Sequence, residues 1–447
     1  MDADTAAARA MPPGPGLPRL VQTLGFMVLR ARFLERSHRR YGDVVSFSTL
    51  FDPRFVMVFA PDLVRQVFQG PPDRLRAGEA NQVLAPLLGA SSVLVLDGAA
   101  HLRQRRLMLP AFHGQRMKAY ETTILAATDR AIERWPVGES FPLLPSMQSI
   151  TLEVIMRAVF GVEEGPLSED LASRVRALLE PVSSPLGVLA TAISRGRFGQ
   201  ARGMRRFEEH RAQLDELLFD EIGRRRRAAD LHEREDVFSS LVLARDENGA
   251  AMSDRELRDE LVTLLVAGHE TTATGLAWTF DLLLHDHRVL ARLRQSVADG
   301  DDSYLDAVVK ESLRLRPVIP GVGRVVRGEP FELAGYRIPP GIEINPSIRV
   351  MHRDPAVYPD AEDFRPERFL GAAAPDTYTW IPFGGGTRRC LGASFALMEM
   401  RLVVRRVLER TALHADAPRR ARVERRGITM SPRGGATVLQ ARSPLPA

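Results

Sequence analysis

The longest helical pattern in the chain constrains its fold more than any other feature. Ser253 and Glu256 have the spacing of a capping box, in which the serine side chain accepts from a backbone N–H and the glutamate side chain reaches back. From there apolar residues recur at helical spacing to about His285, which gives roughly 33 residues and, at ~1.5 Å per residue, about 50 Å. A helix of this length traverses a whole molecule, so the other elements must pack around it.

Much of the remaining chain up to residue 289 also has a helical pattern. Helices are predicted over residues 26–41, 117–135, 149–160 and 204–231. Strands are predicted at 44–50 and 55–60, and again after Pro317, with hairpins over 331–350. The chain is expected to end in a helix after Gly392 and a hairpin around 427–439.

The charge balance does not indicate a nucleic-acid partner. Lys and Arg total 61 against 56 Asp and Glu, a net charge of +5, and the excess is spread along the 447 residues. Lysine occurs only at Lys118 and Lys310, so nearly all the cations are arginine. We therefore expect a solvated surface and no binding of nucleic acid.

Neither a membrane span nor a secretory signal is predicted. The chain lacks the ~20 consecutive apolar residues that cross a bilayer, because the apolar run 24–29 is cut short by Arg30 and Arg32. Cys390 is the only cysteine, so no disulfide can form within the chain. A cytoplasmic location is the expectation.

Cys390 lies in the segment Phe-Gly-Gly-Gly-Thr-Arg-Arg-Cys-Leu-Gly at residues 383–392. The glycines permit positive φ and a close approach of the backbone to a large planar group. Arg388 and Arg389 favour the ionised thiolate over the thiol. A lone cysteine is more often an inert buried thiol that packs as a small hydrophobe. These neighbours shift the balance toward a metal-bound thiolate.

The pattern Phe-x-x-Gly-x-Arg-x-Cys-x-Gly resembles the haem-binding loop of the cytochrome P-450 superfamily, the haem-thiolate monooxygenases. It matches at Phe383, Gly386, Arg388, Cys390 and Gly392. The resemblance implies that Cys390 is the axial thiolate ligand of the iron of haem b. It also implies a mainly α fold with a smaller β-rich lobe, in which the long central helix lies over the haem.

Within the long helix, Gly268, His269, Glu270, Thr271 and Thr272 interrupt the apolar run. Each lowers helix propensity or risks an unsatisfied polar group. From the residues alone, the threonines can bond back to the i−4 carbonyl while Glu270 faces solvent. The resemblance implies a different role, in which Glu270 and Thr271 relay the protons that reduction of oxygen consumes. It also implies that Gly268 leaves room for oxygen beside the iron.

Glu311 and Arg314 lie three residues apart on one face of a helix that ends before Pro317. This spacing is uninformative by itself. Together with the segment Phe-Arg-Pro-Glu-Arg-Phe at residues 364–369, it resembles the buried Glu-Arg-Arg network of the family. The resemblance implies that Glu311, Arg314 and Arg368 support the loop of Cys390, a structural role.

His101 and Arg105 lie four residues apart on one face of a predicted helix, a spacing that usually marks a solvated surface. The segment resembles the haem-propionate helix of the family, with histidine in place of the more familiar tryptophan. The same comparison adds Arg324 and Arg388. The resemblance therefore implies four donors for the two propionates.

Six arginines flank the segments that the resemblance places on the proximal side of the haem: Arg103, Arg106, Arg389, Arg401, Arg405 and Arg406. They motivate the hypothesis that an acidic ferredoxin or flavodoxin, itself reduced by a reductase, docks there. No flavin or iron–sulfur domain is visible in the chain. Electrons must then come from a separate protein.

The stretches through which the family contacts substrate are mostly apolar in this chain. This predicts a lipophilic substrate such as a fatty acid, a terpene or another secondary metabolite, although ordinary core packing is the alternative for many of these residues. They are Val83, Leu84, Leu87, Leu88, Val182, Leu186, Leu189, Leu264, Val318, Ile319, Val322 and Ile428.

The sequence thus predicts a soluble, bacterial haem monooxygenase that inserts one atom of O2 into its substrate by hydroxylation or epoxidation. A peroxide-driven or rearranging haem-thiolate enzyme and a non-catalytic haem sensor are the alternatives. Residues 1–25 are expected to form a proline-rich arm and residues 26–447 a single domain. The stretch 12–16 resembles the hinge after the anchor of membrane-bound relatives, yet only eleven residues precede it, so no transmembrane anchor is expected.

Overall fold

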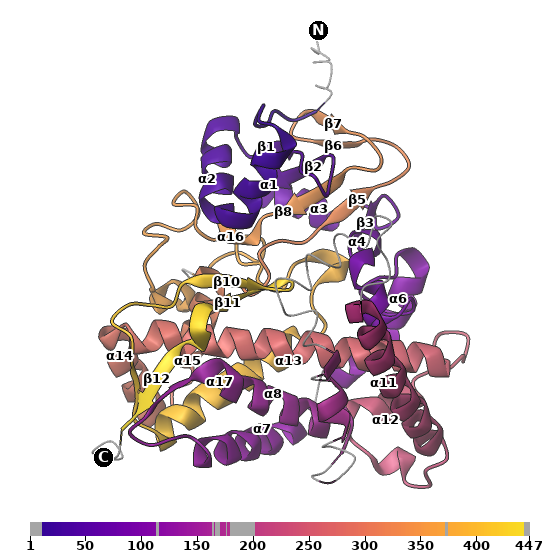
Figure 1. The fold of residues 1–447 in the computed structure, drawn as a ribbon, viewed down its shortest axis with the longest axis vertical. Helices are drawn as coiled ribbons and strands as arrows, with labels where there is room; N and C mark the ends of the chain where they lie inside the picture. The colour runs from indigo at the N-terminus through magenta and orange to yellow at the C-terminus, as the bar shows by residue number, and fades with distance from the viewer. Residues whose placement is uncertain are drawn as a thin grey trace.

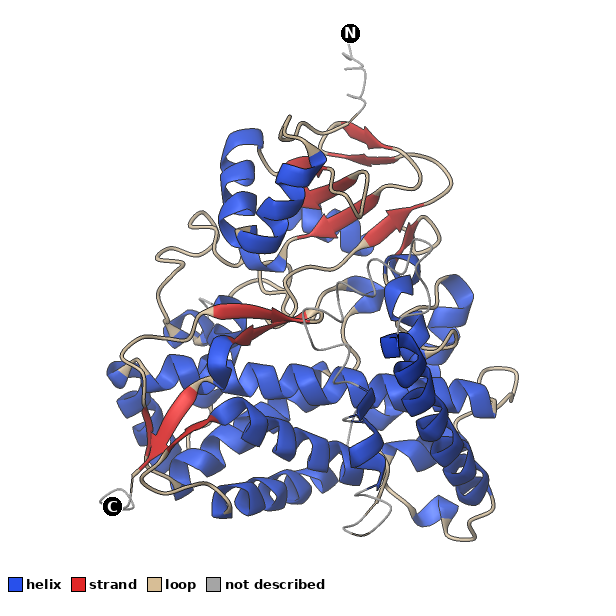
Figure 2. Ribbon diagram, viewed as in Figure 1, coloured by secondary structure: helices blue, strands red, loops and turns tan. Residues whose placement is uncertain are grey.

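The computed structural model describes residues 11–112, 116–162, 165, 170–175, 177–178, 202–371 and 374–441. Helices dominate one lobe, and a second, smaller lobe contains most of the strands (Figure 2). The predicted fold class is therefore confirmed.

The predicted long helix is α13 (Asp254–Leu284), 31 residues long, and it crosses the width of the helical lobe (Figure 1). Its N-terminus has the predicted capping box: the Ser253 hydroxyl accepts from the N–H of Glu256, and the Glu256 carboxylate accepts from the N–H of Ser253. The helices around it are α7 (Arg116–Glu133), α8 (Leu143–Ala158), α11 (Arg202–Arg226), α12 (Val237–Leu243), α14 (His287–Ala298), α15 (Ser303–Leu315) and α17 (Ala393–Arg410).

The C-terminal half of α13 lies in the core of this lobe. Residues 272–284 are all buried, as a helix that contacts neighbours on every side requires. Two of the buried polar groups in this half have these partners: Thr279 Oγ1 donates to the carbonyl of Gly275, and Asp281 accepts from the N–H of Ala421. The helix is therefore held in a fixed position against α8, α15 and α17.

The second lobe is built on a five-stranded sheet in the order β1-β2-β8-β5-β3. Its strands are β1 (Val44–Phe47), β2 (Phe55–Val58), β8 (Glu343–Pro346), β5 (Arg324–Val326) and β3 (Leu75–Arg76). Strands β2 and β8 are parallel, and the other neighbours are antiparallel. The helices of this lobe are α1 (Arg19–Val28), α2 (Arg30–Tyr41), α3 (Pro61–Gln69) and α16 (Ile348–Met351). The hairpin of β6 (Phe331–Leu333) and β7 (Tyr336–Ile338) lies in the same lobe (Figure 1).

The predicted helix over 26–41 is two helices, which meet at Leu29 (φ −119°, ψ 23°). The first of them, α1, begins at Arg19 and so lies partly within the expected arm. The arm itself contacts the sheet, because the carbonyl of Pro13 accepts from the N–H of Ser46. Among the described residues, no helix combines the length and apolar character that crossing a membrane requires.

The predicted C-terminal hairpin over 427–439 is wrong in its pairing. Strand β10 (Val423–Arg426) pairs with β11 (Thr429–Pro432), but β12 (Thr437–Gln440) pairs with β4 (Ser140–Pro142) and β9 (Leu413–Ala415). Gly434, Gly435 and Ala436 all have positive φ, and this left-handed backbone redirects the chain into a different sheet.

Three short helices lead from the sheet to the helical lobe, and they carry much of the candidate site. They are α4 (Ala77–Ala80), α5 (Ala85–Leu88) and α6 (Gly98–Met108).

Candidate active site

The loop of Cys390 is bent by glycines and packed against α3. Gly384 and Gly386 have φ values of 68° and 64°, and the N–H of Cys390 donates to the carbonyl of Phe383 at 3.0 Å. A Cβ on Gly386 would lie 2.1 Å from the carbonyl oxygen of Phe68, so only glycine fits there. The loop is thus fixed by its own backbone and by α3.

Cys390 is an exposed residue, although protein atoms crowd its thiol on most sides. Burial raises the pKa of the thiol, while the N–H of Gly392 and the guanidinium groups of Arg105 and Arg389 act in the opposite direction. Gly392 is also the N-cap residue of α17. A thiol that remains reachable beside two cations can serve as a metal ligand.

Four predicted donors lie close together, and one of them, Arg105, also acts on the thiol. We call them the cationic cluster: the arginines Arg105, Arg324 and Arg388, together with His101. Burial, together with Arg388, Arg105 and Arg324, lowers the pKa of His101 to about 3. Burial and Arg388 lower the pKa of Arg324 to about 10, and Asp97 opposes this change. Positive charge is therefore concentrated here beyond what Asp97 balances.

Arg388 makes its hydrogen bonds with the segment that precedes α6. Its guanidinium donates to the carbonyls of Val93 and Leu96 and to the Asp97 carboxylate at 2.5 Å. Asp97 in turn accepts from two backbone N–H groups of α4, at 2.8 Å each. Asp97, which was not predicted from the sequence, thus joins the cysteine loop to α4.

Three polar side chains of α13 hold the loop before α6, and the sequence analysis did not single them out. Their contacts are Asp259 with the N–H of Ser91 (2.8 Å), Glu260 with the N–H of Val93 (2.8 Å) and Thr263 with the hydroxyl of Ser92 (2.7 Å). Burial raises the pKa of Glu260 well above its usual value. The hydrogen bond from the N–H of Val93 lowers this pKa, but by less than burial raises it. Because the Val93 carbonyl also accepts from Arg388, α13 and the cysteine loop hold the same short segment.

At the centre of α13, Thr271 Oγ1 donates to the carbonyl of Ala267 at 2.5 Å, the back-bonded arrangement that the residues alone allow. Thr272 is buried. A Cβ on Gly268 would lie 2.8 Å from Ile155 Cδ1 of α8. Close packing of the two helices is thus a second reason for glycine at this position, in addition to the predicted one.

Glu270 does not face open solvent. It is half-buried, and its Oε2 accepts from the side-chain amide of Gln148 on α8 at 2.6 Å. Burial raises the pKa of Glu270, while Gln148 and Arg426 act to lower it. The adjacent His269 is buried, with Nδ1 3.0 Å from the hydroxyl of Thr151. Gln148, which the sequence analysis missed, is the group that holds the carboxylate in place.

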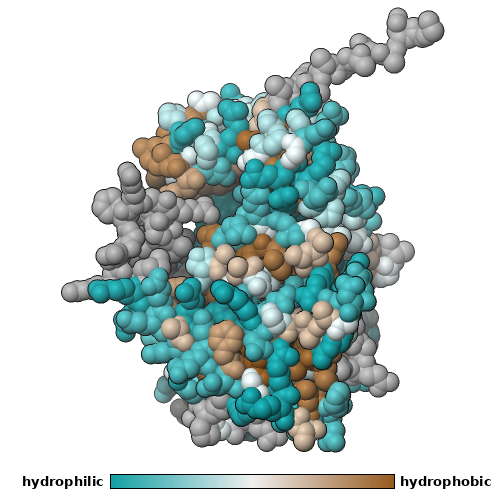
Figure 3. Space-filling model, turned by 90° about the vertical axis from the view of Figure 1, so that its right-hand side faces the viewer, coloured by the Kyte–Doolittle hydropathy of each residue, from teal (hydrophilic) through white to brown (hydrophobic). Residues whose placement is uncertain are grey.

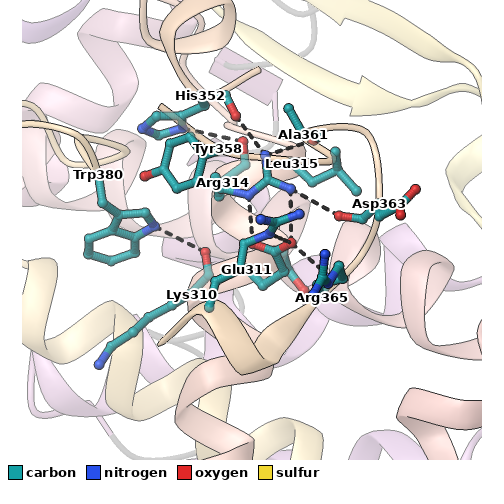
Figure 4. A network of polar contacts seen from close by, with 12 residues as sticks. Lys310, Glu311, Arg314, Leu315, His352, Tyr358, Ala361, Asp363, Arg365 and Trp380 are labelled. Carbon is teal, nitrogen blue, oxygen red and sulfur yellow. Dashed lines mark hydrogen bonds and ion pairs between the residues drawn. The ribbon is translucent and has the colours of Figure 1, made fainter. Parts of the chain in front are cut away.

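The structure brings Glu311 and Arg314 together (Figure 4), and Arg368 lies beside them. Arg314 donates to both oxygens of Glu311, at 2.6 and 2.9 Å, and Arg368 Nε lies 3.4 Å from Glu311 Oε1. The N–H of Arg365 also donates to Glu311. The pair Glu311–Arg314 is completely buried, so each charge depends on the other.

This network connects to the segment that leads into the cysteine loop. His352 Nδ1 lies 3.3 Å from the carbonyl of Arg314, and the N–H of Ile381 donates to His352 Nε2 at 3.0 Å. Trp380 Nε1 donates to the carbonyl of Lys310 (Figure 4). Burial and Arg314 lower the pKa of His352 to about 3, so the ring is neutral and can accept from Ile381.

Glu399 is a further buried carboxyl group, on α17, that the sequence analysis did not single out. Its side chain is 1% exposed, and among the described residues Oε1 has no hydrogen-bond partner. Burial raises the pKa of Glu399 to about 8. The group is therefore expected to be protonated in the folded protein at neutral pH.

We expect the unfolding free energy to fall as pH rises between about 5 and 8, because the folded state retains a proton on Glu399 that the unfolded state has released. The contribution is at most ~1.4 kcal/mol per pH unit. Glu399→Gln should remove it, as measured by urea unfolding of the holoprotein at about pH 6 and about pH 8. Glu409→Gln, partly exposed on the same helix, is the control. Identical pH slopes in the wild type and Glu399→Gln would contradict the assignment.

Five of the six arginines expected on the proximal surface have carboxylate partners. The pairs are Arg103 with Asp246 and Glu256, Arg106 with Glu247, Arg401 with Asp306, Arg405 with Asp302, and Arg406 with Asp129. Arg389 is exposed. The free positive charge of this surface is therefore smaller than the arginines alone suggest.

The expected substrate-contacting residues differ in burial. Leu87, Leu88 and Val318 belong to the main apolar core, whereas Val83 and Ile428 are exposed. The half-buried members are Leu84, Leu264, Ile319 and Val322. Val182, Leu186 and Leu189 lie outside the described residues.

The residues at this site match the needs of a haem. The glycine-bent loop presents one reachable sulfur, which is a soft metal ligand. The cationic cluster has more buried positive charge than Asp97 balances, and the two carboxylates of a haem would complement it. A fold with a long central helix and a thiol loop of this kind is that of a haem-thiolate protein.

Comparison with known proteins supports the assignment to the haem-thiolate class. Residues 11–437 match the family model described as Cytochrome P450. Cytochrome P450 135B1 of Mycobacterium tuberculosis is 42% identical over 97% of this chain and 92% of that protein, and cytochrome P450 138 of the same organism is 39% identical over 97% and 96%. The structure of retinoic acid-bound cyanobacterial CYP120A1 has a TM-score of 0.83 at 25% identity, covering 97% of this chain and 99% of that one. The chain belongs to the cytochrome P450 family, whose members are haem monooxygenases.

Proposed function

We propose that this protein oxidises a lipophilic small molecule, by hydroxylation or epoxidation, with O2 and with electrons from a separate ferredoxin or flavodoxin and its reductase. The observation that carries the proposal is the reachable thiol of Cys390 beside the cationic cluster. Residues 26–447 act as a single unit in this proposal, because the site draws on segments from His101 to Gly392.

The predicted cofactor-binding residues each have a role in holding haem b in this proposal. Cys390 provides the thiolate ligand, and the cationic cluster binds the two propionates. Phe383, Gly386 and Gly392 shape the cysteine loop. When bound, the haem supplies the chemistry that activates O2. The Glu311–Arg314–Arg368 network keeps the segment that leads into the loop in a fixed position.

Thr271 and Glu270 are the proposed proton-delivery residues. The Thr271 hydroxyl donates to Ala267 and keeps its lone pairs free to accept a proton-carrying hydrogen bond. Burial raises the pKa of Glu270 toward the range useful for proton transfer at neutral pH. Gln148 orients the carboxylate. The presence of both groups favours oxygen reduction over the peroxide-driven and sensor alternatives.

A lipophilic substrate is supported by the apolar character of the described segments near α5, α13 and the chain after α15. The structural relative CYP120A1 is bound to retinoic acid, a ligand of this chemical type. We therefore propose an apolar substrate of the size of a fatty acid or terpenoid. The test is a screen of apolar and polar compounds for a shift of the haem absorption band. A response confined to sugars or nucleotides would overturn this proposal.

Comparing reductant-driven with peroxide-driven turnover distinguishes three functions: a monooxygenase, a peroxide-driven enzyme and a haem sensor. We expect product with NADPH, a reductase and ferredoxin or flavodoxin, and at least about tenfold less with hydrogen peroxide in their place. Product with peroxide alone would identify a peroxide-driven enzyme. Haem binding without product under either condition would identify a sensor.

Replacing Thr271 with alanine is expected to uncouple the reaction, because proton delivery loses its hydroxyl group. Product formed per NADPH consumed should fall by at least about tenfold, with hydrogen peroxide accumulating. Thr279→Ala is the matched control, since Thr279 makes the same i−4 hydrogen bond in the same helix. Full coupling in Thr271→Ala, or equal uncoupling in Thr279→Ala, would contradict the assignment.

A further inference from the structure

Exposed apolar side chains gather at one place on the protein. Of the thirteen large hydrophobic residues exposed in the described part of the chain, nine lie between residues 17 and 51. We call these nine the apolar patch: Leu17, Leu20, Val21, Leu24, Met27, Val28, Leu29, Leu50 and Phe51. Val28 is 73% exposed. Apolar surface is visible at the upper left edge of the molecule in Figure 3, in the lobe that contains α1.

The orientation of α1 is inverted relative to an ordinary surface helix, because it buries polar residues and exposes apolar ones. Gln22 Nε2 donates to the carbonyls of Pro15 and Leu17, and its Oε1 accepts from the N–H of Ser48. Thr23 Oγ1 accepts from the N–H of Leu50. These contacts fix the rotation of α1 and place the loop 48–51 beside it.

Aromatic packing anchors the inner side of α1. The ring of Phe26 lies edge-on to Phe33, Phe47 and Phe55, at centroid distances of 5.5, 5.1 and 5.4 Å. The apolar patch is additional to this packing. A patch of this kind on a folded protein marks an interaction surface.

The surroundings of the apolar patch are basic. Within residues 17–51 the exposed charged side chains are five arginines, namely Arg19, Arg32, Arg36, Arg39 and Arg40, and one acid, Asp43, which lies 2.8 Å from His38. A second acid, Glu35, is half-buried and acts on the pKa values of Arg349 and Arg353 inside the protein. The outward face of α1 and α2 thus combines apolar and cationic groups.

We propose that this face binds the surface of a phospholipid membrane that contains anionic headgroups. The apolar patch would enter the boundary between headgroups and acyl chains, and the arginines would contact the phosphates. A second copy of the chain fits less well, because a symmetric dimer through this face would bring the same arginines together. The proposal is independent of the proposed oxidation chemistry and adds a location at which a lipophilic substrate is concentrated.

Vesicle flotation of the full-length holoprotein tests the proposal. We expect flotation with vesicles of phosphatidylcholine and phosphatidylglycerol, weaker flotation with phosphatidylcholine alone, and loss of binding at high salt. The double variant Met27→Asp/Val28→Asp should reduce binding at least about tenfold. Arg36→Glu/Arg39→Glu should remove the preference for phosphatidylglycerol.

The matched control is Phe219→Asp, which places the same charge at an exposed apolar position of α11, outside the patch. It should float like the wild type, and the haem absorption spectrum of every variant should show that the fold is retained. No flotation of the wild type, or equal flotation of Met27→Asp/Val28→Asp, would overturn the proposal. So would a lipid-free dimer that the same double variant abolishes, because the patch would then bind a second copy.

Discussion

Cys390→Ser is expected to abolish oxidation of the substrate and to remove the red-shifted Soret band that a haem-thiolate protein shows when reduced and exposed to carbon monoxide. A serine hydroxyl does not ionise near neutral pH, and its oxygen is a hard ligand in place of a soft sulfur. The loop itself should keep its shape, since its bend depends on Gly384 and Gly386 and on the approach to Phe68.

The control for this prediction is Thr387→Ala, at an exposed position in the same loop. It should keep the red-shifted band and the rate of oxidation. If Cys390→Ser retained the red-shifted band, the ligand would be a different group and the proposed oxygen chemistry would lose its basis. Circular dichroism of the variant separates this result from simple unfolding.

Glu311→Ala is expected to destabilise the folded protein by about 3–5 kcal/mol, because it leaves the guanidinium of Arg314 buried without its carboxylate. The N–H of Arg365 would lose its acceptor as well. The measurement is the urea unfolding midpoint of the holoprotein, together with its haem content. We expect haem to be lost more readily, since the network leads through His352 and Ile381 to the cysteine loop.

Glu247→Ala provides the comparison, because Glu247 also forms an ion pair with an arginine but at the exposed surface. Glu247→Ala should lower the free energy of unfolding by less than about 1 kcal/mol. Equal effects of the two substitutions would show that burial does not make the Glu311 pair important. If Glu311→Ala yields no folded protein, Glu311→Gln keeps the shape of the side chain and permits the same measurement.

Local patterns were sufficient to predict much of the fold. The capping box at Ser253 and the apolar period behind it located α13 to within a residue or two at each end. Strands β1 and β2 also lie within their predicted ranges. The prediction failed where the outcome depended on distant segments: α8 begins at Leu143, earlier than expected, and β12 pairs with β4 and β9 instead of β11.

In the candidate site, too, local motifs were predicted and contacts between distant segments were not. The motif around Cys390 and the Glu311–Arg314 spacing were visible in the sequence because each lies within ten residues. The partners Asp97, Gln148 and Glu260 were missed, since nothing near them in the chain distinguishes them from other polar residues. Gln148, for example, meets Glu270 only because α8 packs against α13.

The order of amino acids alone was enough to locate the thiol loop, the central helix and the family, because backbone conformation, capping and hydrophobic period depend on neighbours along the chain. Which charges are buried, and which group compensates each of them, was decided by the packing of distant segments. The free energy of a charge depends on how much water the surrounding protein removes and on which partner remains within hydrogen-bond distance. That is why Arg388 pairs with Asp97 and why burial raises the pKa of Glu399.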